Sequence, residues 1–236
     1  PACEARARAY IEEIAEHDFP TLTGPRRDPR RFLAYLRAVA ALESQPASFS
    51  ALTRRMQEEF TAAVGAAAVP ALHDLAERMF LVEDQPAWSP RLRSKQAAAK
   101  APTRHLADPS LVAGFLGAGV DRLLADPETL GFLFEGQVVH DVRVYAQAAE
   151  ARGVFHYRDS KGRDEIDIVV EGHDGAWLGV EVGLGGGQVS AAAENLRRVA
   201  AKIERTPVGL VVVTPAGIAH RRDDGVVVVP LSTLGP

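Results

Sequence analysis

Several features that define common protein classes are missing from this chain of 236 residues. It has a single cysteine, Cys3, which excludes an internal disulfide and a zinc site built from several cysteines. No apolar run approaches the roughly 20 residues that a helix needs to span a bilayer. The first residues also lack the pattern of a signal peptide. We therefore expect a cytoplasmic protein without a membrane partner.

The chain also lacks the sequence of a phosphate-binding loop. Such a loop needs a Gly-rich turn followed by Lys and Ser or Thr, whose amides and ammonium hold nucleotide phosphates. The densest glycine run, at 183–187, has no lysine after it and leads into an Ala-rich segment. We interpret this run as a turn between a strand and a helix. No ATP site is expected in this chain.

A surplus of basic residues is absent as well. The formal net charge of -4 argues against a protein that binds nucleic acid through a basic surface throughout. Solvated surface charge explains the local basic clusters more simply than phosphate binding does. These clusters consist of Arg26, Arg27, Arg30, Arg31 and Arg37, and of Arg91, Arg93, Lys95, Lys100 and Arg104.

The first part of the chain has the apolar spacing of helices. With 47% hydrophobic residues, the sequence can form one large or two small globular domains. We expect a helical domain over 1–86. Its helices are predicted at 5–17, from Pro29 behind a capping Asp28, from Ser48 or Ser50, and at 70–80, with a strand at 80–84.

The remaining sequence predicts a crossing segment and then an α/β (α+β) domain. Residues 87–107 contain prolines and few periodic apolar positions, so they are expected to connect the two domains. Over 108–236 we expect a mixed central sheet flanked by helices. The predicted helices begin at Asp108-Pro109 and Pro127 and span 190–203, and the predicted strands are 154–157, 165–170, 177–182, 210–213 and an edge strand at 226–229.

Acidic residues mark two neighbouring strands of this second domain. Asp167 lies on the first strand and Glu181 on the second, and a short turn with glycines joins the strands. Carboxylates from adjacent strands can converge on one Mg²⁺ or Mn²⁺ ion. Asp167 and Glu181 are therefore the first candidates for metal ligands and for catalytic residues of phosphodiester hydrolysis. Glu165 shares the face of Asp167 and is either a further acid or a partner of Arg163.

A series of short segments carries a family resemblance. The segments are AWSPRL at 87–92, KAP at 100–102, LADPSL at 106–111, LFE at 133–135 and HYRD at 156–159, followed by the acidic strands. In this order they resemble the C-terminal half of the prokaryotic AAA-type predicted ATPases. The resemblance reaches back to about residue 5. It implies a winged-helix segment, then a PD-(D/E)XK nuclease-like domain, with an ATPase domain upstream or in trans as a partner.

The resemblance also assigns roles to individual positions. It implies Glu135, on the long helix from Pro127, as a third metal ligand beside Asp167 and Glu181. In this nuclease fold the second strand reads Glu-X-Lys, and here Gly183 occupies the lysine position. Removing one positive group beside a developing negative charge commonly lowers a rate by about 100- to 1,000-fold. Lys161 and Lys202 are the nearest replacements in the sequence.

The N-terminal half departs from what DNA reading requires. In a winged helix the third helix enters the major groove, where exposed polar and basic side chains read the bases. The corresponding stretch, 62–74, is mostly alanine and other apolar residues. We expect packing or homo-oligomer formation there in place of sequence-specific DNA recognition, since an alanine surface loses little side-chain entropy on contact.

Three functions remain open from the sequence. The favoured one is a non-catalytic module with a degenerate nuclease fold, which acts in nucleic-acid binding, protein binding or assembly. The second is a weak Mg²⁺- or Mn²⁺-dependent nuclease on DNA or RNA that uses Glu135, Asp167 and Glu181. The third is the remnant of an ATP-binding AAA ATPase that has lost its P-loop domain. Gly183 argues against the second function, and the missing phosphate-binding loop argues against ATP hydrolysis by this chain alone.

Overall fold

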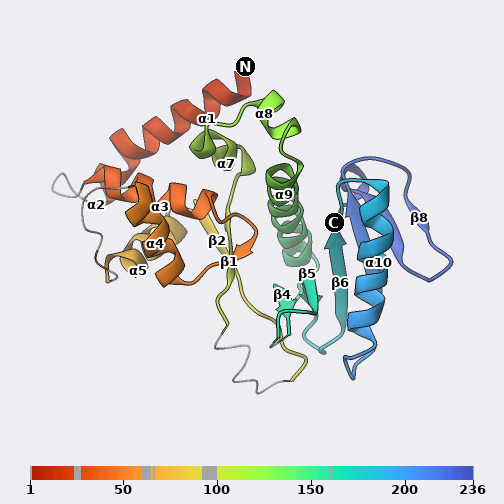
Figure 1. The fold of residues 1–236 in the computed structure, drawn as a ribbon. Helices are drawn as coiled ribbons and strands as arrows, with labels where there is room; N and C mark the ends of the chain where they lie inside the picture. The colour runs from red at the N-terminus through yellow and green to blue at the C-terminus, as the bar shows by residue number, and fades with distance from the viewer. Residues whose placement is uncertain are drawn as a thin grey trace. The chain divides into compact units, whose positions relative to one another are not determined.

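The computed structural model in Figure 1 describes residues 2–23, 28–59, 65, 67–91, 100–159 and 161–235. Its backbone contacts form two compact units. The first unit comprises Pro1–Asp84 and Thr103–Gly136, and the second comprises Gln85–Pro102 and Gln137–Pro236. These units differ from the expected segments 1–86, 87–107 and 108–236, because each unit combines two separate stretches of chain. The expected domain boundaries stay a prediction.

The first unit is mainly helical. Asp28 and Asp108 accept hydrogen bonds from backbone N–H groups two residues further on, at 2.9 and 2.7 Å, as N-cap residues do. The predicted helix starts at Pro29 and Pro109 are therefore confirmed. The helical elements of this unit are α1 (Ala2–Glu13), the π-helix η1 (Ile14–Asp18), α2 (Phe19–Thr23), α3 (Pro29–Ala40), α4 (Phe49–Glu59), α5 (Ala68–Arg78), α7 (Pro109–Leu116) and α8 (Val120–Leu124).

A small sheet lies beside these helices. Its strands are β1 (Gln45–Pro46), β2 (Val82–Gln85) and β3 (Thr103–Leu106), in the order β1-β3-β2. The strand expected at 80–84 is confirmed as β2. Within the expected crossing at 87–107, residues Thr103–Leu106 form a buried strand. Most residues of this strand are polar, so the sequence shows no apolar alternation there. They are buried together with polar partners, such as Glu43, whose Oε1 lies 3.0 Å from Nδ1 of His105.

Some residues used in the sequence interpretation lie outside the described part of the chain. In the basic clusters these are Arg26, Arg27, Arg93 and Lys95. Residues 62–64 and 66 of the stretch compared with a DNA-reading helix are outside as well. The assignments at these positions stay predictions. Within the part of the chain that the structure describes, no helix is both long and apolar enough to cross a membrane.

The second unit contains a six-stranded mixed sheet, which confirms the expected α/β fold class. Strands β4, β5 and β6 form an antiparallel meander, and β6, β7 and β9 pair in parallel. The expected edge position of 226–229 is wrong, because the two-residue strand β8 pairs outside β9 and is too short to show a pattern. The order is β4 (Gly153–Arg158), β5 (Glu165–Glu171), β6 (Trp177–Val182), β7 (Gly209–Thr214), β9 (Val227–Pro230) and β8 (His220–Arg221).

Helix α10 (Gly186–Ala200) covers strands β5, β6 and β7 of this sheet (Figure 1). The glycine run is confirmed as a strand-to-helix turn, although the helix begins at Gly186, four residues before the predicted start. The core beneath α10 contains Leu196, Val212 and both tryptophans of the chain, Trp88 and Trp177, whose ring centroids are 5.1 Å apart. The remaining helices are α9 (Pro127–Ala148), which contributes to both units, and the 3-10 turn η2 (Leu231–Thr233).

The pairing of β4 with β5 in the second unit contains a β-bulge at Asp167. Phe155 pairs with Val169 and Tyr157 pairs with Ile166, so one residue of β4 lies opposite two residues of β5, Asp167 and Ile168. Such bulges change the direction of side chains and occur often beside active sites. The bulge therefore interrupts the regular alternation of β5 at the residue that the sequence nominated as a ligand.

Gln85 stabilises this bulge from the side. Its side chain is fully buried, and Nε2 donates to the backbone carbonyl of Phe155 at 3.1 Å and to that of Asp167 at 2.9 Å. The residues that follow Gln85 in the chain run along β4, and the backbone N–H of Trp88 donates to the carbonyl of His156 at 2.7 Å. One amide side chain thus supplies hydrogen bonds that the irregular strand pairing leaves open.

Replacing Gln85 by leucine should destabilise the second unit. Gln85→Leu would leave buried carbonyl groups without their donor, and we expect the free energy of unfolding to fall by about 1–3 kcal/mol. Urea unfolding followed by tryptophan fluorescence reports on this unit, since both tryptophans lie in its core. Gln147→Leu, at an exposed position of α9, is the matched control. Equal stability of the two variants would contradict this role of Gln85.

Candidate functional site

Strands β5 and β6 bring the two nominated acids next to each other. The antiparallel register pairs Ile168 with Val180, and one further step along it leads to Asp167 and Glu181. Both side chains are partly buried. The two carboxylates therefore lie at the end of the β5–β6 pairing, where the bulge of β5 begins.

Hydrogen bonds from the strand and from α10 orient these carboxylates. Oδ2 of Asp167 accepts the backbone N–H of Val182 at 2.9 Å. Oε1 of Glu181 accepts from Nδ2 of Asn195 at 3.0 Å. The same Asn195 nitrogen donates to the backbone carbonyl of Glu165 at 2.8 Å, which fixes the amide between the two strands. Neither acid depends on a loop for its position.

The environment favours the protonated form of both acids. Burial raises the pKa of Asp167 to about 6, and the charge of Glu165 adds to this increase. Burial raises the pKa of Glu181 to about 9, with the neighbouring charge of Asp167 as the next cause. Two carboxylates in a poorly solvated place cannot both ionise without a cost, so they titrate as a pair. A bound cation would remove this cost.

No lysine or arginine is among the main causes of the pKa shifts of Asp167 and Glu181. Lys202, one of the two lysines considered as replacements, places Nζ 2.6 Å from Oδ2 of Asp164. Arg198 also pairs with Asp164, and the hydrogen bond from Lys202 is the main reason that the pKa of Asp164 is lowered. The other candidate, Lys161, is exposed in the turn after β4.

Glu165 contacts a different arginine from the one considered in the sequence. Its Oε1 lies 3.4 Å from a guanidinium nitrogen of Arg158 on β4, the strand paired with β5. Arg163 had been the sequence-based alternative. The antiparallel pairing of Arg158 with Glu165 explains the difference, since cross-strand neighbours lie closer than residues of one turn.

Gly183 stands where the nuclease pattern has its lysine. Its N–H donates to the carbonyl of Val213 at 2.9 Å, so its backbone continues the parallel pairing with β7. A Cβ atom here would lie 3.6 Å from Cβ of Gln188, which is an ordinary van der Waals contact. The backbone at this position therefore has room for the Cβ atom of a larger residue.

The third nominated ligand, Glu135, lies on α9 in the first compact unit, whereas Asp167 and Glu181 belong to the second. Its role as a metal ligand stays a prediction that rests on the family resemblance. Two protein carboxylates fit a hard cation such as Mg²⁺, which is commonly bound by one or two carboxylates and keeps several waters. The donor set of Asp167 and Glu181 therefore suits Mg²⁺ or Mn²⁺.

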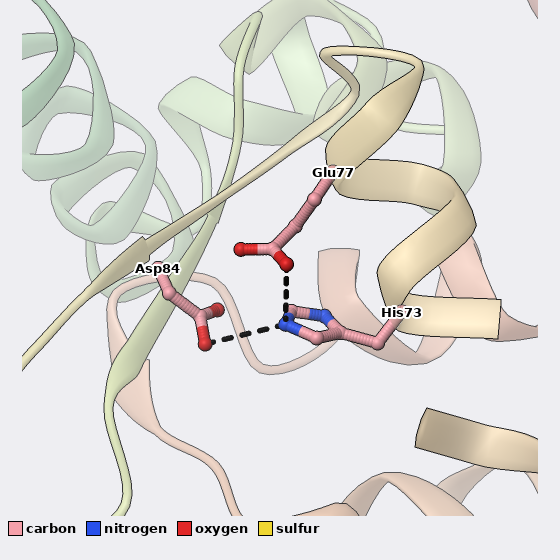
Figure 2. Close-up of side chains that lie close together, drawn as sticks. All are labelled: His73, Glu77 and Asp84. Carbon is pink, nitrogen blue, oxygen red and sulfur yellow. Dashed lines mark ion pairs between the residues drawn. The ribbon is translucent and has the colours of Figure 1, made fainter. Parts of the chain in front are cut away.

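A different cluster was missed by the sequence reasoning. Among the described residues, one set of three side chains places its potential ligand atoms within 4.8 Å of one another, and it consists of His73, Glu77 and Asp84 (Figure 2). The spacing of four residues between His73 and Glu77 on a predicted helix was the available signal. Asp84 lies on strand β2, and only the tertiary structure shows that it is close to His73.

The acid pair should lower stability at neutral and alkaline pH. Because the folded-state pKa values of Asp167 and Glu181 lie above the ordinary ones, metal-free protein should lose stability between about pH 5 and 9. Glu181→Gln removes this cost while its amide oxygen can still accept from Asn195. We expect it to raise the free energy of unfolding at pH 8 by about 1–3 kcal/mol, measured by urea unfolding with EDTA.

The exposed Glu194 on α10 provides the control for this measurement. Glu194→Gln should leave both the stability and its pH dependence within about 0.5 kcal/mol of the original protein. If Glu181→Gln were no more stable than the original protein at pH 8, the electrostatic cost assigned to the pair would be refuted.

Two known families together match nearly the whole chain. Residues 130–234 match the family described as "Domain of unknown function (DUF4143)", a range that includes Asp167, Glu181 and all six strands of the second sheet. Residues 2–122 match the family described as "Domain of unknown function (DUF8612)". No curated protein and no solved structure matches the chain. Because the match over residues 2–122 covers more than half of the 236 residues, the chain belongs to the DUF8612 family.

Proposed function

We propose that this chain is a non-hydrolytic nuclease-like module that binds nucleic acid through a divalent cation held by Asp167 and Glu181. The observation that carries this proposal is the pair itself, two oriented carboxylates on adjacent strands with Gly183 in place of the lysine. The helix-covered mixed sheet supports the nuclease-like assignment. The proposal separates metal binding, for which the ligands are present, from cleavage, for which the ammonium is missing.

Each residue has a defined part in this proposal. Asp167 and Glu181 would hold the cation, and Asn195 and the N–H of Val182 orient them. A bound Mg²⁺ or Mn²⁺ would neutralise the charge of a phosphate and could polarise water. Gly183 supplies no positive group beside the phosphate. The chain therefore has the means to hold a phosphodiester and lacks one group that would stabilise the transition state of its hydrolysis.

Helix α10 and the turn after it supply a basic surface on the same unit. Arg197, Arg198, Lys202 and Arg205 are all exposed there. Arg198 and Lys202 are paired with Asp164, and Arg205 lies near Asp174, so their net field is reduced. The pair of Arg205 with Asp174 is exposed at both ends, and such pairs are weak and salt-dependent. A phosphate backbone could compete for these side chains, and binding should weaken as salt increases.

A larger assembly is part of the proposal. The domain matched by residues 130–234 is typically the C-terminal region of AAA-ATPase-like proteins, which supports an ATPase domain as the partner. The first unit has the element order α3, β1, α4, α5, β2, β3 with a three-stranded sheet, which supports the expected winged-helix segment. Its helix α5 exposes Asp74 and Glu77, and these acids disfavour approach to DNA.

A weak metal-dependent nuclease is the second candidate. The observation in its favour is that both acids keep their hydrogen-bonded orientation beside a bulge. Loss of the lysine would lower the rate by about 100- to 1,000-fold and need not abolish it. The two candidates differ in one measurable property, which is cleavage by the original protein in the presence of metal.

Calorimetric titration should detect metal binding by the acid pair. We expect Mn²⁺ or Mg²⁺ to bind with an affinity that rises between about pH 6 and 9, because the ligands must lose protons. Asp167→Asn with Glu181→Gln should abolish this binding, and Glu194→Gln should not. Metal-dependent retention of single-stranded DNA without its cleavage is expected in parallel. No binding at millimolar metal would contradict the proposal, and cleavage by the original protein would establish the nuclease instead.

Restoring the missing lysine should restore cleavage. We expect Gly183→Lys to raise metal-dependent cleavage of plasmid DNA by at least about 100-fold over the original protein. Gly183→Met, which has a long uncharged side chain, is the control for changes in packing. Inactivity of Gly183→Lys with metal binding intact would show that the carboxylates are not arranged for phosphodiester hydrolysis.

A further inference from the structure

His73 has a fixed orientation in the core of the first unit. The residue is 4% exposed, and its ring lies edge-on to Tyr35 and Phe49, with centroids 6.2 and 5.3 Å away. Its Nδ1 atom is 2.7 Å from the hydroxyl of Tyr35. The hydroxyl oxygen of Tyr35 can accept a hydrogen bond from Nδ1–H at this distance. Nδ1 of His73 is therefore hydrogen-bonded to Tyr35, and Nε2 is left to contact other groups.

The other ring nitrogen faces two carboxylates, as Figure 2 shows. Nε2 of His73 lies 3.3 Å from Oδ2 of Asp84 and 3.6 Å from Oε2 of Glu77. His73 and Glu77 are four residues apart on α5, which places them on one face, and Asp84 lies on β2. All three belong to the first compact unit.

These distances match the spacing of ligands around a tetrahedral metal ion. Zinc–nitrogen bonds of about 2.0–2.1 Å and zinc–oxygen bonds of about 2.0–2.2 Å separate tetrahedral ligand atoms by about 3.3–3.6 Å. The two distances from Nε2 fall in this range. The hydroxyl of Tyr35 has the position of the outer partner that commonly orients a metal-bound histidine through its second nitrogen.

We propose that Nε2 of His73, Oε2 of Glu77 and Oδ2 of Asp84 bind a divalent transition-metal ion, with Zn²⁺ as the preferred ion. One imidazole and two carboxylates are borderline and hard ligands that suit Zn²⁺. Three protein ligands leave a fourth position for water. The ion would connect helix α5 to strand β2 across the short turn between them.

The surrounding charges allow such an ion. Nε of Arg104 lies 3.1 Å from Oδ1 of Asp84, the carboxylate oxygen that does not face His73, and the guanidinium stacks over Phe49 at 4.6 Å. Arg104 therefore contacts the outer oxygen of Asp84 and leaves Oδ2 toward the cluster. Glu77 has a 46% exposed side chain, which gives an ion a route from solvent. The two carboxylates supply two negative charges beside Zn²⁺, and Arg104 adds one positive charge next to Asp84.

The chain contains a matched pair without the third ligand. His17 and Glu13 also stand four residues apart, with Nδ1 and Oε2 at 3.2 Å, and both side chains are more than half exposed. Among the described residues they belong to no cluster of three potential ligands. This pair tests whether binding needs the assembled site or only a histidine and a glutamate on one helix face.

Titration of tag-free, metal-free protein with Zn²⁺, and with Co²⁺ followed by visible absorption, tests the proposal. We expect one high-affinity site per chain. Glu77→Gln, at the most exposed ligand, should keep the fold and lower affinity by more than about 100-fold, since even an outer partner is worth about 10- to 100-fold. Tyr35→Phe, which keeps all three ligands, should lower affinity by about 10- to 100-fold.

His17→Gln should leave the affinity unchanged. Asp167→Asn with Glu181→Gln should also leave it unchanged, which separates this site from the proposed Mg²⁺ or Mn²⁺ site. Circular dichroism verifies the folding of each variant. Absence of Zn²⁺ and Co²⁺ binding by the original protein, or binding that survives Glu77→Gln, would overturn the proposal whatever the outcome at the acid pair of the second unit.

Discussion

The second unit depends on how two carboxylates are kept close together in a poorly solvated place. Asp167 and Glu181 repel each other, and burial raises the pKa of both. Local hydrogen bonds offset part of this cost, because the N–H of Val182 and the amide of Asn195 each donate to one acid. Gln85 stabilises the bulged backbone below them. A fold that maintains such a pair carries a local instability that a bound cation would relieve, as is common at functional sites.

The two candidate ion sites illustrate two ligand chemistries in one chain. The acid pair offers oxygen ligands alone, which favours Mg²⁺ or Mn²⁺ and leaves coordination positions for water and phosphate. The cluster of the first unit offers a buried imidazole whose second nitrogen contacts Tyr35, together with two carboxylates, and this set favours Zn²⁺. Each site joins two consecutive elements of the chain, β5 with β6 and α5 with β2. Metal binding would therefore stabilise each unit through mass action.

Much of the architecture could be predicted from the sequence because local signals are strong. The caps Asp28 and Asp108, the helix at Pro127 and the acidic strands all appear where pattern and capping rules place them. Strand β3 was missed because its polar residues are buried by partners from elsewhere in the chain. The same limit applies to sites. Adjacent strands bring Asp167 and Glu181 together, whereas the approach of Asp84 to His73 depends on tertiary packing that no local pattern records.

The central claim is that Asp167 and Glu181 are metal ligands in a protein that does not cleave. Crystals grown with Mn²⁺ and single-stranded DNA, measured for anomalous scattering, test it most directly. We predict a manganese peak between the two carboxylates, bound to a phosphate oxygen of intact DNA. A map without manganese at this pair, or with manganese beside cleaved DNA, would contradict the account.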